Sequence, residues 1–372
     1  RELRTLLVRM ARSTQRPADG PFRMPVDRVF NIEGRGCVVA GTPWSGTVNV
    51  GDHLQLMPAG KRVRVRELEV HDQSVSHSCP GQRTAMTLTG VSQHDVARGD
   101  ELVAEDTHRP TRRIVVQMNL FRDASEIRCP ATVQLHTATR SCEARLLGAG
   151  PIRAGQSAIV VVDTDQPIVA TYLQQCLFRS PYPVGSFAGG RILASIERAA
   201  RQTTRALSFG QRLVDAGSAE RLAAWVDFLG ELDLTSSGSA LQLGLDSAAI
   251  DSAVETCTER GWFYRPKQHL LVSRQNVARI RSQTEQLLAS QAETTDNAWL
   301  AEESVVTRSR NAGSPAVLRW VIDDLVQEKS LVRVNKMLAV ASSATVLSKK
   351  QRSQMERLLE LYADSRMPPT LK

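Results

Sequence analysis

The sequence predicts a multidomain β + α protein in which two antiparallel β-barrels are followed by tandem winged-helix domains. Residues 21–193 are rich in short segments that alternate polar and apolar side chains between Gly, Pro and Asp turns, which is typical of small barrels. After residue 193 the pattern changes to helices followed by pairs of short strands. This helical unit occurs twice, and a repeated unit predicts a module better than a single copy does.

Length and composition are those of an ordinary globular chain with a basic charge. The 372 residues are enough for several domains, and 42% of them are hydrophobic. No apolar run is long enough to span a bilayer, so we expect no membrane partner. The six cysteines lack C-x-x-C spacing and histidine partners, which favours reduced thiols in a cytoplasmic protein without a metal site. A net charge of +8 favours a polyanionic partner, most simply nucleic acid.

Residues 1–20 are expected to be the tail of a preceding domain and a linker. Residues 1–10 have the pattern of the end of an amphipathic helix, with no methionine start and no N-cap. Because nothing upstream is present for this helix to pack on, the chain is expected to be a fragment. The phosphate-binding pattern G-x-x-x-x-G-K-[ST] does not occur, so we expect no nucleotide cofactor in this chain.

Residues 21–106 are predicted to form the first barrel. Polar and apolar side chains alternate along residues 22–30, which indicates a strand with one buried face. Residues 63–70 alternate in the same way, with a basic side outward and a Val/Leu side inward. The other strand-like segments of this barrel are residues 37–42, 53–56, 79–88 and 95–102.

Residues 107–200 are predicted to form the second barrel, and two winged helices are predicted at residues 205–273 and 274–345. The barrel strands are expected at 113–120, 130–136, 142–147 and 156–162. The helices of the first module are expected at 219–229, 234–244 and 247–259, the last with Asp246 as its N-cap. Those of the second module are expected at 276–289, 300–308 and 315–327. Residues 346–372 are expected to start a truncated third module.

Short motifs of the first barrel are similar to the second domain of translational GTPases of the elongation factor Tu kind. They are P-x-D-x-V-F at residues 25–30, G-x-G-x-V-x-x-G at 34–41, G-x-V-x-x-G-D at 46–52 and D-V-A-R-G-D at 95–100. V-H-x-Q at 70–73, P-G-Q-R at 80–83 and the tandem winged helices narrow the resemblance to bacterial selenocysteine-specific elongation factors. The second barrel ends in a phrase similar to R-x-S-P…G-G-G, but Ala188 replaces the first glycine and the loop between Ser180 and Gly190 is longer.

The resemblance implies a binding site for the aminoacyl end of selenocysteinyl-tRNA at Asp27, Arg28 and Arg83. An anionic selenolate would be bound by cationic donors, and arginine presents a fixed fork of N–H groups. Many members of the family have histidine where Arg28 stands. The alternative is an exposed pair of charges at a strand end, together with a solvated arginine.

The predicted hairpins of the two winged helices carry basic side chains that could contact RNA phosphates. They are Arg265, Lys267, Arg333 and Lys336. The hairpins are expected at residues 262–272 and 331–340, the second with its turn at Asn335 and Lys336. Against this, neither predicted recognition helix is basic, and a helix that reads DNA normally presents Arg, Asn or Gln. These modules are therefore also interpreted as spacers, with contacts to the messenger hairpin implied for later winged helices beyond Lys372.

Three classes of function compete. The resemblance implies a selenocysteine-specific elongation factor that delivers selenocysteinyl-tRNA to the ribosome, with GTP and Mg²⁺ bound by a GTPase domain upstream of this chain. The alternative is a winged-helix regulator that binds nucleic acid and carries β-barrel sensor domains. An enzyme would need a clustered nucleophile, acid–base pair or metal set, and none is recognisable. His71 beside Asp72 is interpreted as a turn histidine.

Overall fold

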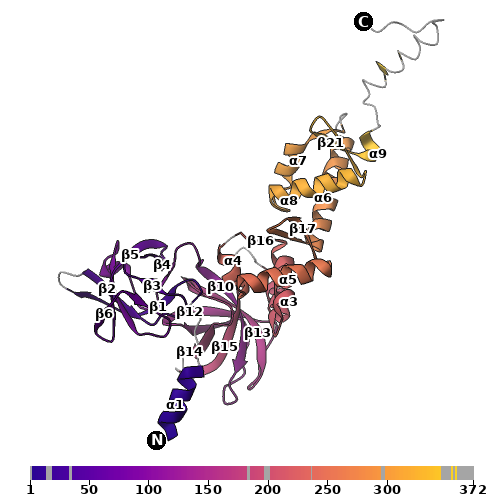
Figure 1. Ribbon diagram of the computed structural model, residues 1–372. Coiled ribbons are helices and arrows are strands. Elements are labelled where there is room, and N and C mark those ends of the chain that lie inside the picture. Colours follow the sequence, from indigo (N-terminus) through magenta and orange to yellow (C-terminus); the bar gives the residue numbers. More distant parts are fainter. Residues whose placement is uncertain are drawn as a thin grey trace. The chain divides into compact units, whose positions relative to one another are not determined.

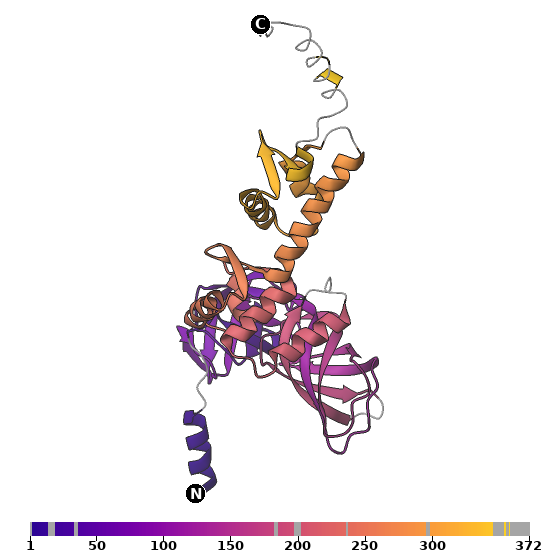
Figure 2. The ribbon, with the colours of Figure 1, turned by 90° about the vertical axis from the view of Figure 1, so that its right-hand side faces the viewer.

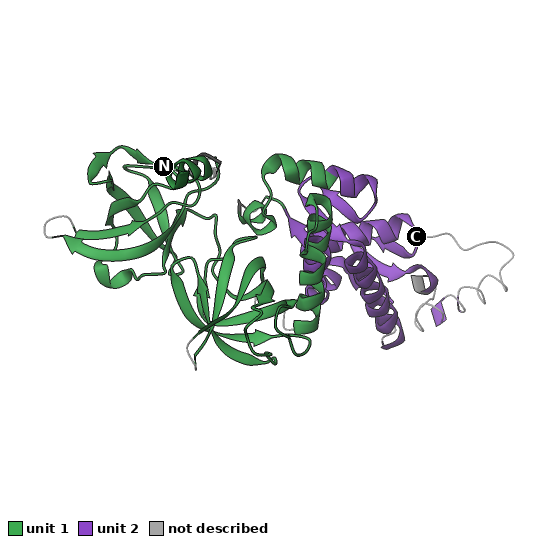
Figure 3. Cartoon of the chain, turned by 90° about the horizontal axis from the view of Figure 1, so that it is seen from below, with its two compact units in different colours: residues 1–224, 234–254 green, residues 225–233, 255–372 purple. Residues whose placement is uncertain are grey.

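The computed structural model describes residues 2–13, 19–32, 36–181, 185–196, 202–235, 237–294 and 298–344, together with residues 353, 354 and 357. The chain divides into two compact units, which Figure 3 colours separately. Unit 1 contains residues 1–224 and 234–254, and unit 2 contains residues 225–233 and 255–372. This division falls inside the range predicted for the first winged helix, and the predicted domain boundaries stay predictions. No helix of the described part of the chain is long and apolar enough to cross a membrane.

The first barrel is antiparallel, as predicted, and six of the seven strands of its sheet close it, while β6 adds to β5 outside the ring. The segments up to its end are α1 (Glu2–Ser13), β1 (Arg23–Ile32), β2 (Gly36–Gly41), β3 (Val48–Asn49), β4 (His53–Met57), β5 (Lys61–Val70), β6 (Gln73–Val75), β7 (His77–Ser78), β8 (Thr84–Thr89), η1 (Gln93–Asp95) and β9 (Glu101–Ala104). The strands pair in the order β4-β9-β1-β2-β8-β5, and β5 pairs with β4 to close the barrel. Apolar side chains such as Met24, Leu56 and Leu102 fill its interior.

The second barrel is also closed and six-stranded, which confirms the predicted pair of barrels (Figure 1). Its strands are β10 (Thr111–Leu120), β11 (Ala131–Thr137), β12 (Arg140–Leu147), β13 (Ser157–Ile168), β14 (Gln175–Ser180) and β15 (Gly185–Ile196). They pair in the order β10-β13-β12-β11-β14-β15, and β15 pairs with β10. The core includes the fully buried Ile114, Leu146 and Phe178. Strands β14 and β15 were not among the predicted strands, although Phe178 of β14 lies in the core.

A buried polar network around Arg23 joins the two barrels. The Arg23 guanidinium donates to the Glu101 carboxylate at 2.5 and 3.0 Å. It also reaches the second barrel, where it donates to Thr171 Oγ1 at 2.8 Å and to Gln174 Oε1 at 2.9 Å. Arg140 of the second barrel donates to the Asp100 carboxylate of the first at 2.6 Å. These contacts fix the two barrels against each other within unit 1.

Helix α2 (Thr203–Leu213), which was not predicted, packs on the outside of the second barrel. Its Gly210 lies so close to the sheet that a Cβ atom there would come within 2.4 Å of the Val115 side chain and 2.6 Å of Ile159. Only a glycine allows this approach, since any side chain would have to displace the barrel wall. The packing therefore extends the barrel layer by one helix.

The first predicted winged helix has the element order helix, strand, two helices and a strand pair. The elements are α3 (Ser218–Leu229), β16 (Glu231–Asp233), α4 (Ser237–Leu243), α5 (Ser247–Glu259), β17 (Phe263–Lys267) and β18 (Leu270–Ser273), with strand order β16-β18-β17. Asp246 caps α5 as predicted, because its Oδ1 accepts from the Ala249 amide at 2.7 Å. Strand β16 was missed, since three residues carry too little periodicity to be recognised.

The second predicted winged helix repeats this order in unit 2. Its elements are α6 (Arg274–Thr294), β19 (Leu300–Ala301), α7 (Glu302–Arg308), α8 (Pro315–Gln327), β20 (Leu331–Val334) and β21 (Met337–Val340), followed by α9 (Ala341–Ala344). The strand order β19-β21-β20 is the counterpart of that in the first module. Figure 2 shows α6 as one unbroken helix, longer than predicted. The expected third module at 346–372 lies outside the described residues, apart from three isolated positions.

Candidate functional site

Asp27 and Arg83, two of the predicted site residues, form an ion pair on the first barrel. Arg83 lies in the turn before β8, and its guanidinium donates to both carboxylate oxygens of Asp27 on β1, at 2.5 and 3.0 Å. The hydrogen bonds to Asp27 raise the pKa of Arg83 above its ordinary value. The Arg83 side chain is 50% exposed, so the pair contributes at most about 1 kcal/mol to stability. Its clearer effect is to compensate the charge of Asp27.

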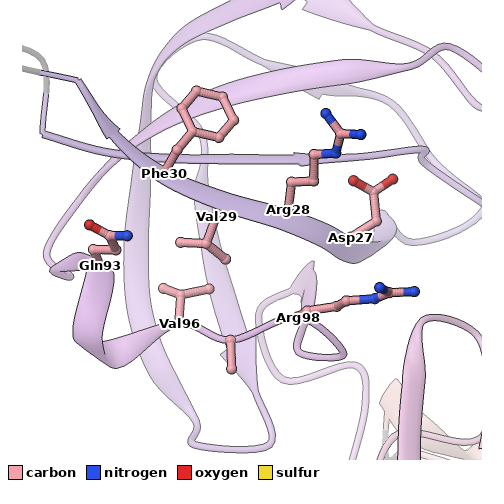
Figure 4. A pocket seen from close by; sticks show the side chains of 8 residues that line it. Asp27, Arg28, Val29, Phe30, Gln93, Val96 and Arg98 are labelled. Carbon is pink, nitrogen blue, oxygen red and sulfur yellow. The ribbon is translucent and has the colours of Figure 1, made fainter.

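A hollow of about 430 Å³ lies beside this ion pair. It is lined by Asp27, Arg28, Val29, Phe30, Gln93, Val96, Ala97 and Arg98 (Figure 4). Val29 and Val96 give it an apolar surface, and Phe30 is partly exposed beside them. Arg28 and Arg98 are exposed and have no ion-pair partner within the described residues. Because Asp27 is already paired, the lining has a net positive charge and would attract an anionic group.

Arg98 was not among the residues predicted for this site, and Arg83 does not line the hollow. Arg98 belongs to the D-V-A-R-G-D motif at residues 95–100. Because Arg98 and Arg28 are far apart in the sequence, the motif alone does not show that both line the same hollow. Asp95 in the same loop does not neutralise it, since Asp95 pairs with Lys61 at 2.5 Å. That contact holds the pKa of Asp95 well below its usual range.

Two of the four predicted RNA-binding cations make contacts within the protein. Arg265 donates to the Gln268 carbonyl oxygen at 2.8 and 2.6 Å, which supports the turn between β17 and β18. Arg333 on β20 pairs with Glu302 at 3.1 Å and Asp323 at 2.6 Å. Both side chains therefore help to stabilise the hairpins on which they lie.

The other two, Lys267 and Lys336, are exposed at the ends of the strand pairs. Neither side chain has a hydrogen-bond or ion-pair partner in the described part of the chain. Lys336 and Asn335 form the predicted turn, with φ angles of 62° and 49°. The four cations lie on two separate hairpins, Arg265 and Lys267 on the β17–β18 pair and Arg333 and Lys336 on the β20–β21 pair.

The N-terminus of α8 is used for packing within unit 2. The Glu231 carboxylate accepts from the Ser314 amide and hydroxyl at 3.1 to 3.2 Å. Further along the helix, the Trp320 ring lies 5.5 Å from that of Tyr264. A helix that reads DNA presents its first residues to the major groove, which these contacts oppose. Among the described residues, no group of acidic, His or Cys side chains is placed to hold a metal ion.

Curated proteins similar to this chain include translation factors of two kinds. A selenocysteine-specific elongation factor of Desulfomicrobium baculatum is 30% identical over 237 residues, which are 63% of this chain and 37% of that protein. One from Haemophilus influenzae is 31% identical over 196 residues, 52% of this chain and 30% of that protein. An elongation factor 1-alpha of Metallosphaera sedula is 34% identical over 133 residues, 34% of this chain and 30% of that protein. The chain thus spans about a third of the length of these relatives. No family model matches it.

A solved structure has the same fold over nearly the whole chain. The crystal structure of the bacterial selenocysteine-specific elongation factor EF-Sec aligns with a TM-score of 0.71 at 16% identity, covering 97% of this chain and 56% of that one. At this identity the likeness concerns the fold alone. Together with the sequence relatives it confirms the resemblance predicted above: over most of its length, this chain is similar to selenocysteine-specific elongation factors.

Proposed function

We propose that this chain is the tRNA-binding and linker portion of a selenocysteine-specific elongation factor. In this role the two barrels bind selenocysteinyl-tRNA and the winged helices connect them to parts that bind the messenger hairpin. Delivery to the ribosome at recoded UGA codons would be switched by GTP and Mg²⁺ in a GTPase domain that the sequence in hand does not contain. The similarity over 237 residues supports the factor class.

The aminoacyl site is proposed at the hollow beside Asp27 and Arg83, and the observation that carries it is the surplus of arginine there. A selenolate is an anion near neutral pH, whereas the seryl hydroxyl is neutral. Arg28 and Arg98 line the hollow without carboxylate partners of their own. The Asp27–Arg83 pair would hold the middle of β1 against the turn before β8, so that the guanidinium groups of Arg28 and Arg98 face the amino acid.

The proposal is tested by the discrimination between two charged tRNAs. With the full-length parent protein and GTP, we expect selenocysteinyl-tRNA to be protected from ester hydrolysis at least tenfold better than seryl-tRNA. The Arg28→Gln and Arg98→Gln variants should each lose about tenfold of this preference, since a hydrogen bond to a charged group contributes about 1.5–3 kcal/mol. The matched control Arg122→Gln removes an exposed arginine from the second barrel and should retain it. Equal protection of both tRNAs by the unsubstituted protein would reject the site.

The regulator with β-barrel sensor domains is less well supported by the structure. Its recognition helices should be basic and accessible, but α5 carries Asp251, Glu255 and Glu259 and no cation. The first turn of α8 is bonded to Glu231. Direct base reading by either helix is therefore not proposed.

A further inference from the structure

A second basic surface follows strand β5 on the outside of the first barrel. Arg62 and Arg64 alternate with the buried Val63 and Val65, so these two arginines leave the same face of the sheet. Arg66 is also exposed and lies at the irregularity where the pairing of β5 with β8 shifts by one residue. We call these three residues the β5 stripe. Alternate residues of a regular strand are about 6.6–7 Å apart, which is the spacing of Arg62 and Arg64 along β5. Arg66 follows them at the register shift. The stripe does not line the hollow described above.

Most of the charge of the stripe is not compensated. Arg62 pairs with Glu105 at 3.3 Å, but its side chain is still 73% exposed. Among the described residues, the Arg64 guanidinium donates only to the carbonyl oxygen of Gly51, at 3.3 Å. Arg66 has no polar partner within the described residues. Two of the three guanidinium charges therefore lack a carboxylate partner in the part of the chain that the structure describes.

The neighbours of the stripe on the same sheet are polar. His53 and Gln55 of β4 lie opposite Arg64 and Arg62, and Thr89 of β8 lies opposite Arg64 on the other side. Glu67 and Glu69 follow further along β5, so the cationic surface ends there. Protein–protein interfaces usually have a core of aromatic residues and methionine, and none occupies these paired positions. The surface is suited to a hydrated polyanion rather than to an apolar protein face.

We propose that the β5 stripe binds the sugar–phosphate backbone of duplex RNA, independently of its sequence. In duplex DNA each strand carries a phosphate about every 3.4 Å along the axis, and the shorter rise of A-form RNA brings its phosphates closer still, so three successive exposed arginines lie opposite several phosphates. Arginine forks bind phosphate oxygens in pairs, and A-form RNA is recognised through its backbone and shape. The duplex could belong to a tRNA or to ribosomal RNA. The stripe goes beyond the aminoacyl site, because it requires no amino acid on the RNA.

The test uses the full chain and a fluorescent 20-base-pair RNA duplex of arbitrary sequence. Binding is measured by anisotropy at several salt concentrations for the unsubstituted chain and for the triple variant R62Q/R64Q/R66Q. Each lost phosphate contact reduces the slope of log K against log salt by about 0.7–0.9, so we expect the slope to fall by about 2 and the affinity to fall about 10- to 100-fold. The control R122Q/R128Q/R153Q removes the same charge from exposed positions of the second barrel and should change neither value.

Additional experiments distinguish tRNA from ribosomal RNA and test whether a membrane surface binds instead. Competition by deacylated tRNA would assign the duplex to tRNA, and competition by small ribosomal subunits would assign it to ribosomal RNA; either supports the proposal. An equal loss in the two triple variants, or an unchanged slope in the β5 variant, would overturn it. So would tighter binding to phosphatidylserine vesicles than to RNA. Because the duplex carries no amino acid, this result does not depend on the discrimination assay for the hollow.

Discussion

Two arginines on strand β1 have opposite environments, although they share a strand and a residue type. Arg23 is 3% exposed and is bonded to Glu101, Thr171 and Gln174 across the junction of the barrels. Arg28 is exposed at the hollow and has no ion-pair partner among the described residues. Residue type alone therefore does not distinguish an arginine that stabilises the fold from one that can bind a ligand. The hydrogen-bond and ion-pair partners of the side chain make that distinction.

The largest loss of stability is expected from substitution of Arg23, the buried arginine of the two. Arg23→Met would leave the Glu101 carboxylate, itself 4% exposed, buried without its partner. Removing one partner of a buried ion pair typically costs about 3–5 kcal/mol. Hydrogen exchange of the β1 and β9 amides should show this loss, whereas Arg28→Met should change the opening free energy by less than about 0.5 kcal/mol. Similar losses in both variants would contradict the distinction between the two arginines.

A smaller, pH-dependent effect is expected at His108, which is buried near Arg23. Burial and then the Arg23 charge lower the pKa of His108 to about 3, from an ordinary value of 6.5. Between these values the unfolded state binds the additional proton, so stability is complete above about pH 6.5 and falls as the pH is lowered toward 3. At pH 5 the loss is on the order of 2 kcal/mol.

The measurement is the urea midpoint of the chain between pH 5 and pH 7. His108→Gln should flatten the pH dependence in this interval, because it removes the group that takes up the proton. His53→Gln is the matched control, since His53 is exposed on β4, and it should leave the dependence as it was. An unchanged pH dependence in the His108 variant would show that another group titrates there.

The parts of the fold that were predictable depend on local pattern. The alternation along residues 63–70 gave a strand with the expected buried face, and Asp246 caps α5 as its position before the helix indicates. The turn at Asn335 and Lys336 was predicted from residue type. Strands β16 and β19 were missed because two or three residues become a strand only through their partners. Helix α2 follows a segment of strands, and its contact through Gly210 depends on the barrel surface.

The candidate site was predicted only in part, for a similar reason. Asp27, Arg28 and Arg83 came from motifs, but their spacing along the chain does not show that Arg83 is bonded to Asp27. Nor does spacing place Arg98 in the hollow beside Arg28. The strand order of the barrel creates both contacts, because β2 lies between β1 and β8 and because β9, which follows Arg98, pairs with β1. In unit 2, the sequence likewise did not distinguish the bonded Arg333 from the unpaired Lys336.

The smallest effect is expected in the β20–β21 hairpin of unit 2, where Arg333 is bonded within the protein and the Lys336 side chain is not. Arg333→Gln removes ion pairs to Glu302 and Asp323, so it should lower the opening free energy of the β20–β21 amides by about 0.5–1 kcal/mol. Lys336→Gln keeps the turn and removes no contact seen among the described residues, so it should leave that energy unchanged. If this hairpin contacts RNA phosphates, the order reverses in an RNA-binding assay, because Lys336 is the cation free to reach them. A greater loss of RNA binding for Arg333→Gln than for Lys336→Gln would contradict the assignment of Arg333 to the fold.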